Sequence, residues 1–156
     1  MGKHKKPKPP AYEIIEGRSS PMVRVQASTW RHLLEVSATA LGQLLRSPDA
    51  SAHPEELPKP STMLSVELHL IDFDAMLEAW LNELLHLGRR HSMVFTAFEI
   101  LQLDLEADCK LTAMIEGSQA STELTHRIDS VGSPAPRTRN HGQRIECEIR
   151  FRTSSV

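Results

Sequence analysis

Apolar and polar residues alternate along several segments of the chain, which is the pattern of β-strands with one buried and one solvated face. The most regular segment is 144–152, where every second side chain is apolar and the residues between them are charged. Its apolar positions, Ile145, Cys147, Ile149 and Phe151, are expected to face the core. Similar patterns predict six further strands, over residues 12–16, 22–27, 64–70, 94–108, 111–116 and 124–131.

Two other segments repeat their apolar residues every three or four positions, which predicts helices with one buried face. The first runs from Trp30 to Leu45, with Ser28 or Thr29 as the candidate N-cap. The second follows Asp72, which is in an N-cap position, and is expected to end near Gly88. Its predicted core face consists of Phe73, Met76, Leu77, Trp80, Leu81, Leu84 and Leu85.

The resulting order is β-β-α-β-α-β-β-β-β, in which strands follow one another in blocks and helices are few. This order predicts an α+β fold rather than a doubly wound sheet. We expect a two-layer sandwich, with both helices packed on one face of a mostly antiparallel or mixed sheet. Residues 47–61, which contain four prolines, and residues 132–143 are predicted to be loops.

The 156 residues suit one domain, which we place at residues 11–152. Residues 1–10 are rich in Lys and Pro and are expected to form a disordered basic tail, and 153–156 a short flexible C-terminus. No apolar run is long enough for a membrane helix, and no apolar segment of a secretory signal follows the basic start. With two cysteines a disulfide scaffold is excluded, and we expect a cytoplasmic protein.

Charge is distributed unevenly along the chain. The net charge is −2, but four lysines lie in the first ten residues, and the remainder carries 14 basic and 20 acidic residues. An acidic body of this kind argues against a large surface for nucleic acid phosphates. We therefore expect no direct base-specific nucleic acid binding.

The sequence contains no recognisable catalytic motif: a Gly-rich phosphate loop, GxSxG and HExxH are all missing. Cys109 is predicted to be an exposed thiol in a turn and Cys147 a core residue. The eight histidines are scattered, no pair has zinc-site spacing, and we expect them on the surface. These observations predict that the protein is not an enzyme.

The helix that follows Asp72 carries a recognisable motif. Residues 72–85 include the run Trp80-Leu81-Asn82-Glu83-Leu84-Leu85 and resemble the corresponding helix of the archease family. Weaker likeness to that family extends, in order, over residues 12–152. The resemblance implies a small cytoplasmic α+β protein that is not itself an enzyme. It further implies a partner, an RtcB-type RNA ligase that joins tRNA halves with GTP and manganese, and a site for a divalent metal.

The metal-site motifs of the family are altered in this chain. The family has a motif close to E-H-T-A-D-V-G after its first strand, whereas here Glu16 is followed by Gly17-Arg18-Ser19-Ser20, with Ser20 in place of the metal-binding Asp. Arg152 replaces the second acid, after Phe151. A hard divalent cation needs oxygen ligands, and a guanidinium opposes it. We therefore assign no catalytic residue, no metal ligand and no cofactor to this chain.

These considerations give two hypotheses of function. The first is an archease-like accessory protein that binds and activates an RtcB-type RNA ligase in tRNA splicing or RNA repair, with the metal-dependent part degenerate. The alternative is a non-catalytic interaction or regulatory module that keeps the scaffold and serves a different partner. Only the first predicts an effect on ligation.

Overall fold

The structure is a computed structural model, and it describes residues 11–16, 21–46 and 56–153. The predicted basic tail lies outside the described residues, as do Ser20, much of the predicted loop at 47–61, and the C-terminal residues 154–156.

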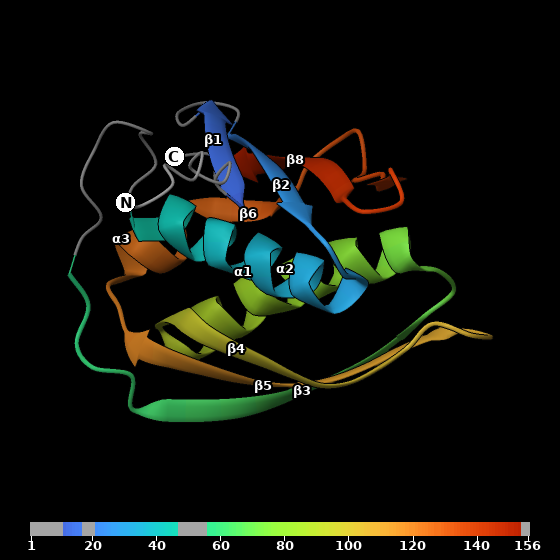
Figure 1. The fold of residues 1–156 in the computed structure, drawn as a ribbon. Helices are drawn as coiled ribbons and strands as arrows, with labels where there is room; N and C mark the ends of the chain where they lie inside the picture. Colours follow the sequence, from blue (N-terminus) through green and yellow to red (C-terminus); the bar gives the residue numbers. More distant parts are fainter. Residues whose placement is uncertain (1–10, 17–20, 47–55, 154–156) are drawn as a thin grey trace, which may run out of the picture.

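The described strands form two separate antiparallel sheets (Figure 1). In the first, the order is β1 (Tyr12–Glu16), β2 (Met22–Ala27), β8 (Ile145–Thr153) and β6 (Ile128–Val131), and the short β7 (Arg139–Asn140) also pairs with β8. In the second, the order is β3 (Thr62–Leu70), β5 (Cys109–Gln119) and β4 (Met93–Asp104).

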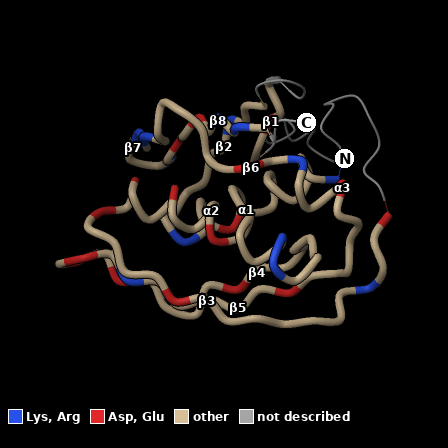
Figure 2. The backbone as a smooth tube through the Cα atoms, turned by 180° about the vertical axis from the view of Figure 1, so that it is seen from behind, with Lys and Arg blue, Asp and Glu red and all other residues tan. Residues whose placement is uncertain are grey.

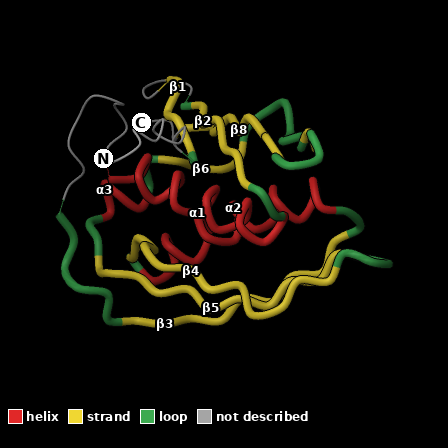
Figure 3. Tube along the Cα trace, in the orientation of Figure 1, coloured by secondary structure: helices red, strands yellow, loops and turns green. Residues whose placement is uncertain are grey.

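The helices α1 (Trp30–Arg46) and α2 (Phe73–His91) lie between the two sheets, and the single turn α3 (Thr122–Thr125) lies at one end (Figure 3). The predicted α+β class and antiparallel pairing are confirmed. The expected arrangement, with both helices on one face of one sheet, is wrong. Alternation shows that each strand has one buried face, but it does not show which strands pair. Two small sheets therefore give the same pattern as one large sheet.

The two helices are tied together at the centre of this sandwich. The Trp80 side chain is fully buried, and its indole Nε1 donates a hydrogen bond to the Leu34 carbonyl oxygen at 2.9 Å. Its ring also meets Phe98 of β4 edge-on, at a centroid distance of 6.2 Å. The predicted core role of Trp80 is thus confirmed, because one side chain contacts both α1 and β4.

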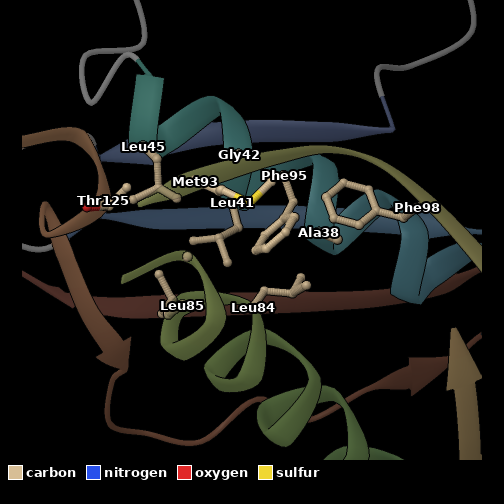
Figure 4. Close-up of a pocket in the computed structure, with 11 residues that line it drawn as sticks. Ala38, Leu41, Gly42, Leu45, Leu84, Leu85, Met93, Phe95, Phe98 and Thr125 are labelled. Carbon is tan, nitrogen blue, oxygen red and sulfur yellow. The ribbon is translucent and has the colours of Figure 1, made fainter. Parts of the chain in front are cut away.

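Glycines bring the helices close to β4. A Cβ on Gly42 of α1 would lie 3.0 Å from the Phe95 carbonyl oxygen, and one on Gly88 of α2 would lie 2.8 Å from that of Met93. Figure 4 shows the small apolar gap that these segments line, with Leu41 and Phe95 among its walls. At about 10 Å³, and with Thr125 as the one polar side chain in its lining, this gap is expected to stay dry.

The ends of the helices agree with the predictions at three of four points. Thr29 is the cap of α1, since its Oγ1 accepts a hydrogen bond from the His32 N–H at 3.1 Å. Asp72 caps α2 through the Ala75 N–H at 2.8 Å. The predicted end of α2 near Gly88 is wrong, because the helix continues to His91. Gly88 serves close packing against β4 rather than termination.

Three strand predictions need correction. The strand predicted over 94–108 ends at Asp104, and a bulge between Ile100 and Gln102 turns Leu101 outward, where it is 48% exposed. The strand predicted over 124–131 is divided into α3 and β6. The loop predicted over 132–143 contains β7, which pairs with β8.

Candidate functional site

The altered motifs come together at one end of the five-stranded sheet. The N–H of Phe151 in β8 donates to the Pro21 carbonyl oxygen at 2.8 Å, which joins the start of β2 to the end of β8. The N–H of Gly132, directly after β6, donates to the Arg150 carbonyl oxygen at 2.6 Å. We call this region the motif edge: residues 16, 21–22, 130–132 and 150–152.

Basic side chains lie on the solvated side of the motif edge. Arg152 is exposed and is opposite Ser130 of β6 in register. The guanidinium of Arg150 contacts the Met22 sulfur at 3.5 Å. The backbone of Glu16 pairs with Met22, but its side chain, like the whole of Ser20, lies outside the description. Of the two substituted positions, the structure therefore places Arg152 at the motif edge and leaves Ser20 unplaced.

A divalent metal finds few ligands among the described residues. Nowhere in that part of the chain do three or more His, Cys, Asp or Glu side chains form a group suited to a metal ion. On the neighbouring outer surface, Glu13 and Glu148 both pair with Arg24, at 3.8 and 3.3 Å. Cations thus lie at and beside the described part of the motif edge, and we derive no chemistry through a metal.

The motif helix holds the motif edge in place. Oδ1 of Asn82 accepts a hydrogen bond from the Val131 N–H at 2.8 Å, and Arg89 forms an ion pair with Asp129 at 3.1 Å. Both contacts tie α2 to β6. Asn82 belongs to the motif recognised in the sequence, but its contact with β6 was not predicted. The available signal was a polar residue between the buried Leu81 and Leu84.

The beginning of α2 holds a second segment through a contact that was not predicted from the sequence. Oδ1 of Asp74 accepts hydrogen bonds from both the N–H and the Oγ1 of Thr138, at 3.1 and 2.6 Å. Thr138 directly precedes β7. The predicted loop at 132–143 is thereby fixed to the helix layer at one point.

Neither cysteine fits the role of a reactive nucleophile. Cys109, predicted to be an exposed turn thiol, is only 4% exposed because it begins β5 and faces the helices. Its burial raises the pKa of the thiol, and the carboxylates of Asp72, Asp108 and Asp104 add to the effect. Cys147 is a core residue as predicted, and burial, followed by the nearby Asp74, raises its pKa to about 12. Both thiols stay protonated at neutral pH.

The six histidines within the described part of the chain are exposed, as predicted: His32, His69, His86, His91, His126 and His141. His4 and His53 lie outside it. Three of the six lie near a carboxylate, and the closest such pair is His69 with Asp108 at 3.2 Å. These are surface ion pairs when the imidazole is protonated, and they are not brought together at one place.

The fold and the motif edge together define a class: a small α+β sandwich of two antiparallel sheets around two helices, with a polar edge held by the second helix. The chain belongs to the archease family, because the model of the Archease protein family (MTH1598/TM1083) matches residues 12–132. That range includes the motif helix and ends at Gly132, before the last strand. No curated protein sequence matches the chain.

Two solved structures share the fold. The solution structure of Methanobacterium thermoautotrophicum protein 1598 matches with a TM-score of 0.67 and 14% identity, over 91% of this chain and 98% of that one. The crystal structure of an archease from Thermotoga maritima, described as a possible chaperone, matches with a TM-score of 0.55 and 13% identity, over 97% and 100%. No helix in the described ranges has the length and apolar character needed to cross a bilayer.

Proposed function

We propose that this protein is an accessory factor without catalytic activity of its own, which binds and activates an RtcB-type RNA ligase in the cytoplasm. The observation that supports this proposal best is family membership, and the described residues form a packed core in which Trp80 and Asn82 make specific hydrogen bonds. The ligase would act in tRNA splicing or RNA repair.

The proposed mode of action relies on protein contacts. Arg152 presents a cation at the motif edge, where the resemblance implies an acid, so a divalent ion is opposed there by charge. A guanidinium offers planar donors suited to carboxylates, and the motif edge can therefore dock directly on an acidic surface of the ligase.

The first experiment is a multiple-turnover RNA ligation assay, with the RtcB-type ligase of the source organism, with and without this protein. We expect the protein to raise the product formed per ligase molecule beyond one turnover. Arg152→Ala should reduce this stimulation, whereas Lys59→Ala, at an exposed loop position beside the other sheet, should not.

An active ligase that neither binds the folded protein nor responds to it would contradict the proposal. The alternative would then apply: a regulatory module that kept the scaffold and changed partner. Ser20 and Arg152 favour this alternative, because each stands where the family resemblance implies a metal-binding acid.

A gain-of-function variant tests the assignment of the altered positions. We expect Ser20→Asp combined with Arg152→Asp to bind manganese or calcium measurably by calorimetry, since it restores two carboxylates and removes a cation. The wild type should show no such binding. The matched control, Ser61→Asp with Lys59→Asp, makes the same change of charge on an exposed loop elsewhere.

Absence of binding in the Ser20 and Arg152 double variant would show that these residues do not correspond to the metal-binding acids. Saturable binding by the wild type would instead show that a metal site persists in a different form.

A further inference from the structure

A pocket of about 480 Å³ lies beside β8, mostly on the side of that strand that faces β6 and β7, and Arg24 of β2 also contributes to its wall. On this side β6 pairs with residues 151–153 of β8 and β7 pairs with residues 145–146, so the segment that joins β6 to β7 leaves β8 and returns to it. The pocket is lined by Pro134, Ala135 and residues 137–139, by residues 146–148 of β8 and by Arg24. Its volume is within the range of small-molecule sites.

The acids of this pocket are already compensated by neighbouring cations. Glu148 pairs with Arg24 at 3.3 Å, and Arg24 also reaches a second carboxylate on β1. Glu146 pairs with Arg144 at 2.6 Å and lies 3.6 Å from His141. These carboxylates therefore do not neutralise the two further arginines of the pocket wall.

Those two arginines are Arg137 and Arg139. Both are exposed, and neither forms a hydrogen bond through its side chain or an ion pair with any residue in the described ranges. Thr138 between them is held by Asp74, as described above. All three residues line the pocket, so anchoring Thr138 to Asp74 fixes the segment that carries the two guanidinium groups.

The backbone of β8 adds a neutral donor. The Arg150 carbonyl oxygen accepts from Gly132, so the peptide groups of Arg150 point toward the side of β6 and β7. Residues two apart in a strand direct their peptide groups to the same side, and the N–H of Glu148 therefore faces the pocket. The guanidinium groups of Arg137 and Arg139 and the N–H of Glu148 thus border the same pocket.

The two sheets differ in charge. Figure 2 shows basic positions on β7 and on the β2 and β8 side of the molecule, while the three-stranded sheet carries mostly acidic ones. The three-stranded sheet has four acidic residues, Glu67, Glu99, Asp104 and Glu116, and Lys110 as its one Lys or Arg. The five-stranded sheet has five acidic residues and four arginines. An anion is therefore repelled less by the five-stranded sheet than by the other.

We propose that this pocket binds a small anion that carries phosphate groups, either a phosphate ester or a polyphosphate. A guanidinium group can donate two parallel hydrogen bonds to two oxygens of one phosphate group. Two arginines close together in the chain therefore suit a ligand that offers several phosphate oxygens. The inference does not rest on the proposed function, since it involves neither the motif edge nor a ligase.

A small ligand fits the pocket better than a nucleic acid strand. Among the described residues, no aromatic side chain lines the pocket, so these residues offer no ring on which a base could stack. The chain as a whole carries a net charge of −2, which opposes the approach of a long polyanion while leaving a local site intact.

The test is calorimetric titration of the full chain with inorganic tripolyphosphate at about 0.15 M salt, where diffuse attraction is screened. We expect saturable binding at one site. The variant Arg137→Gln with Arg139→Gln should bind at least about tenfold more weakly, because each lost charged hydrogen bond weakens binding by roughly that factor or more.

The matched control is Lys59→Gln with Arg90→Gln, which removes the same charge from exposed positions that do not line the pocket. It should bind like the wild type. Circular dichroism checks that each variant is folded. The proposal is overturned if the wild type shows no saturable binding, or if both double variants lose affinity equally.

A second arm titrates a short single-stranded RNA in competition with tripolyphosphate. Failure of the RNA to displace tripolyphosphate supports a small-molecule site. Displacement at a lower RNA concentration, abolished by the Arg137 and Arg139 substitutions, would overturn the proposed ligand class and assign the pocket to RNA.

Discussion

At the scale of single residues, the surroundings of each cysteine decide its chemistry. Cys109 and Cys147 both face the helix layer, and for both the largest cause of the raised pKa is burial. The alternation that places Leu111, Ala113 and Ile115 inward includes Cys109 when it is extended by one step. The burial of Cys109 could therefore have been predicted from the sequence, had the strand been started at this residue instead of at Leu111.

The pKa of Cys147 predicts a dependence of stability on alkaline pH. The thiol has an ordinary pKa of 9.0 in the unfolded chain and about 12 in the folded one, so between these values the folded state binds more protons. The free energy of unfolding then falls as pH rises from 9 to 12, by at most about 1.4 kcal/mol per unit from this group. Below pH 9 the contribution is fully present.

This prediction is checked by urea unfolding at pH 8 and pH 10.5, with Cys147→Ala as the comparison. The loss of stability between the two pH values should be smaller in the variant than in the wild type. Equal losses in both proteins would show that other groups cause the pH dependence.

At the scale of secondary-structure elements, the sequence predicts the type of an element better than its ends. Gly88 was expected near the end of α2, but the helix continues to His91. Glycine is needed at position 88 because β4 crosses the helix there too closely for a side chain. The bulge at Leu101 also could not be predicted from the sequence, because the alternation of Leu101, Leu103 and Leu105 appears unbroken there. In both cases the local structure depends on a neighbouring strand: β4 beside Gly88, and β5 beside the bulge in β4.

The variant Gly88→Ala tests this reading of α2. Alanine is the better helix former by about 1 kcal/mol, so a glycine with no packing role would be improved by the substitution. Here the new Cβ would lie 2.8 Å from the Met93 carbonyl oxygen, and we expect a net destabilisation of about 1–2 kcal/mol. Chemical denaturation measures it, and His86→Ala on the exposed side of the same helix is the control.

At the scale of the whole molecule, the sequence predicts which residues form the core but not how the layers are arranged. The predicted inward faces of the last strand and of α2 are confirmed, yet they could be satisfied by one sheet or by two. The motif edge was likewise foreseen only as separate motifs, because the register that joins Pro21, Phe151 and Gly132 is a property of the assembled sheet.

The sandwich predicts cooperative unfolding, because both sheets pack on the same two helices. Trp80→Ala leaves a cavity and removes the hydrogen bond to Leu34, and should cost about 3–5 kcal/mol. The fluorescence of the remaining Trp30 and far-ultraviolet circular dichroism should report the same shifted midpoint. Separate midpoints would mean that the sheets unfold independently, and an unchanged midpoint would contradict the core role of Trp80.

The two irregularities in β4 bear on how this molecule meets its own copies. β4 is an outer strand of its sheet, and an outer strand offers unpaired peptide groups to any other extended chain. Its pairing with β5 shifts register between Phe95 and Ala97 and again between Ile100 and Gln102. A strand bent at two points is a poor template for a foreign strand, so the bulge that exposes Leu101 also protects the protein against edge-to-edge aggregation.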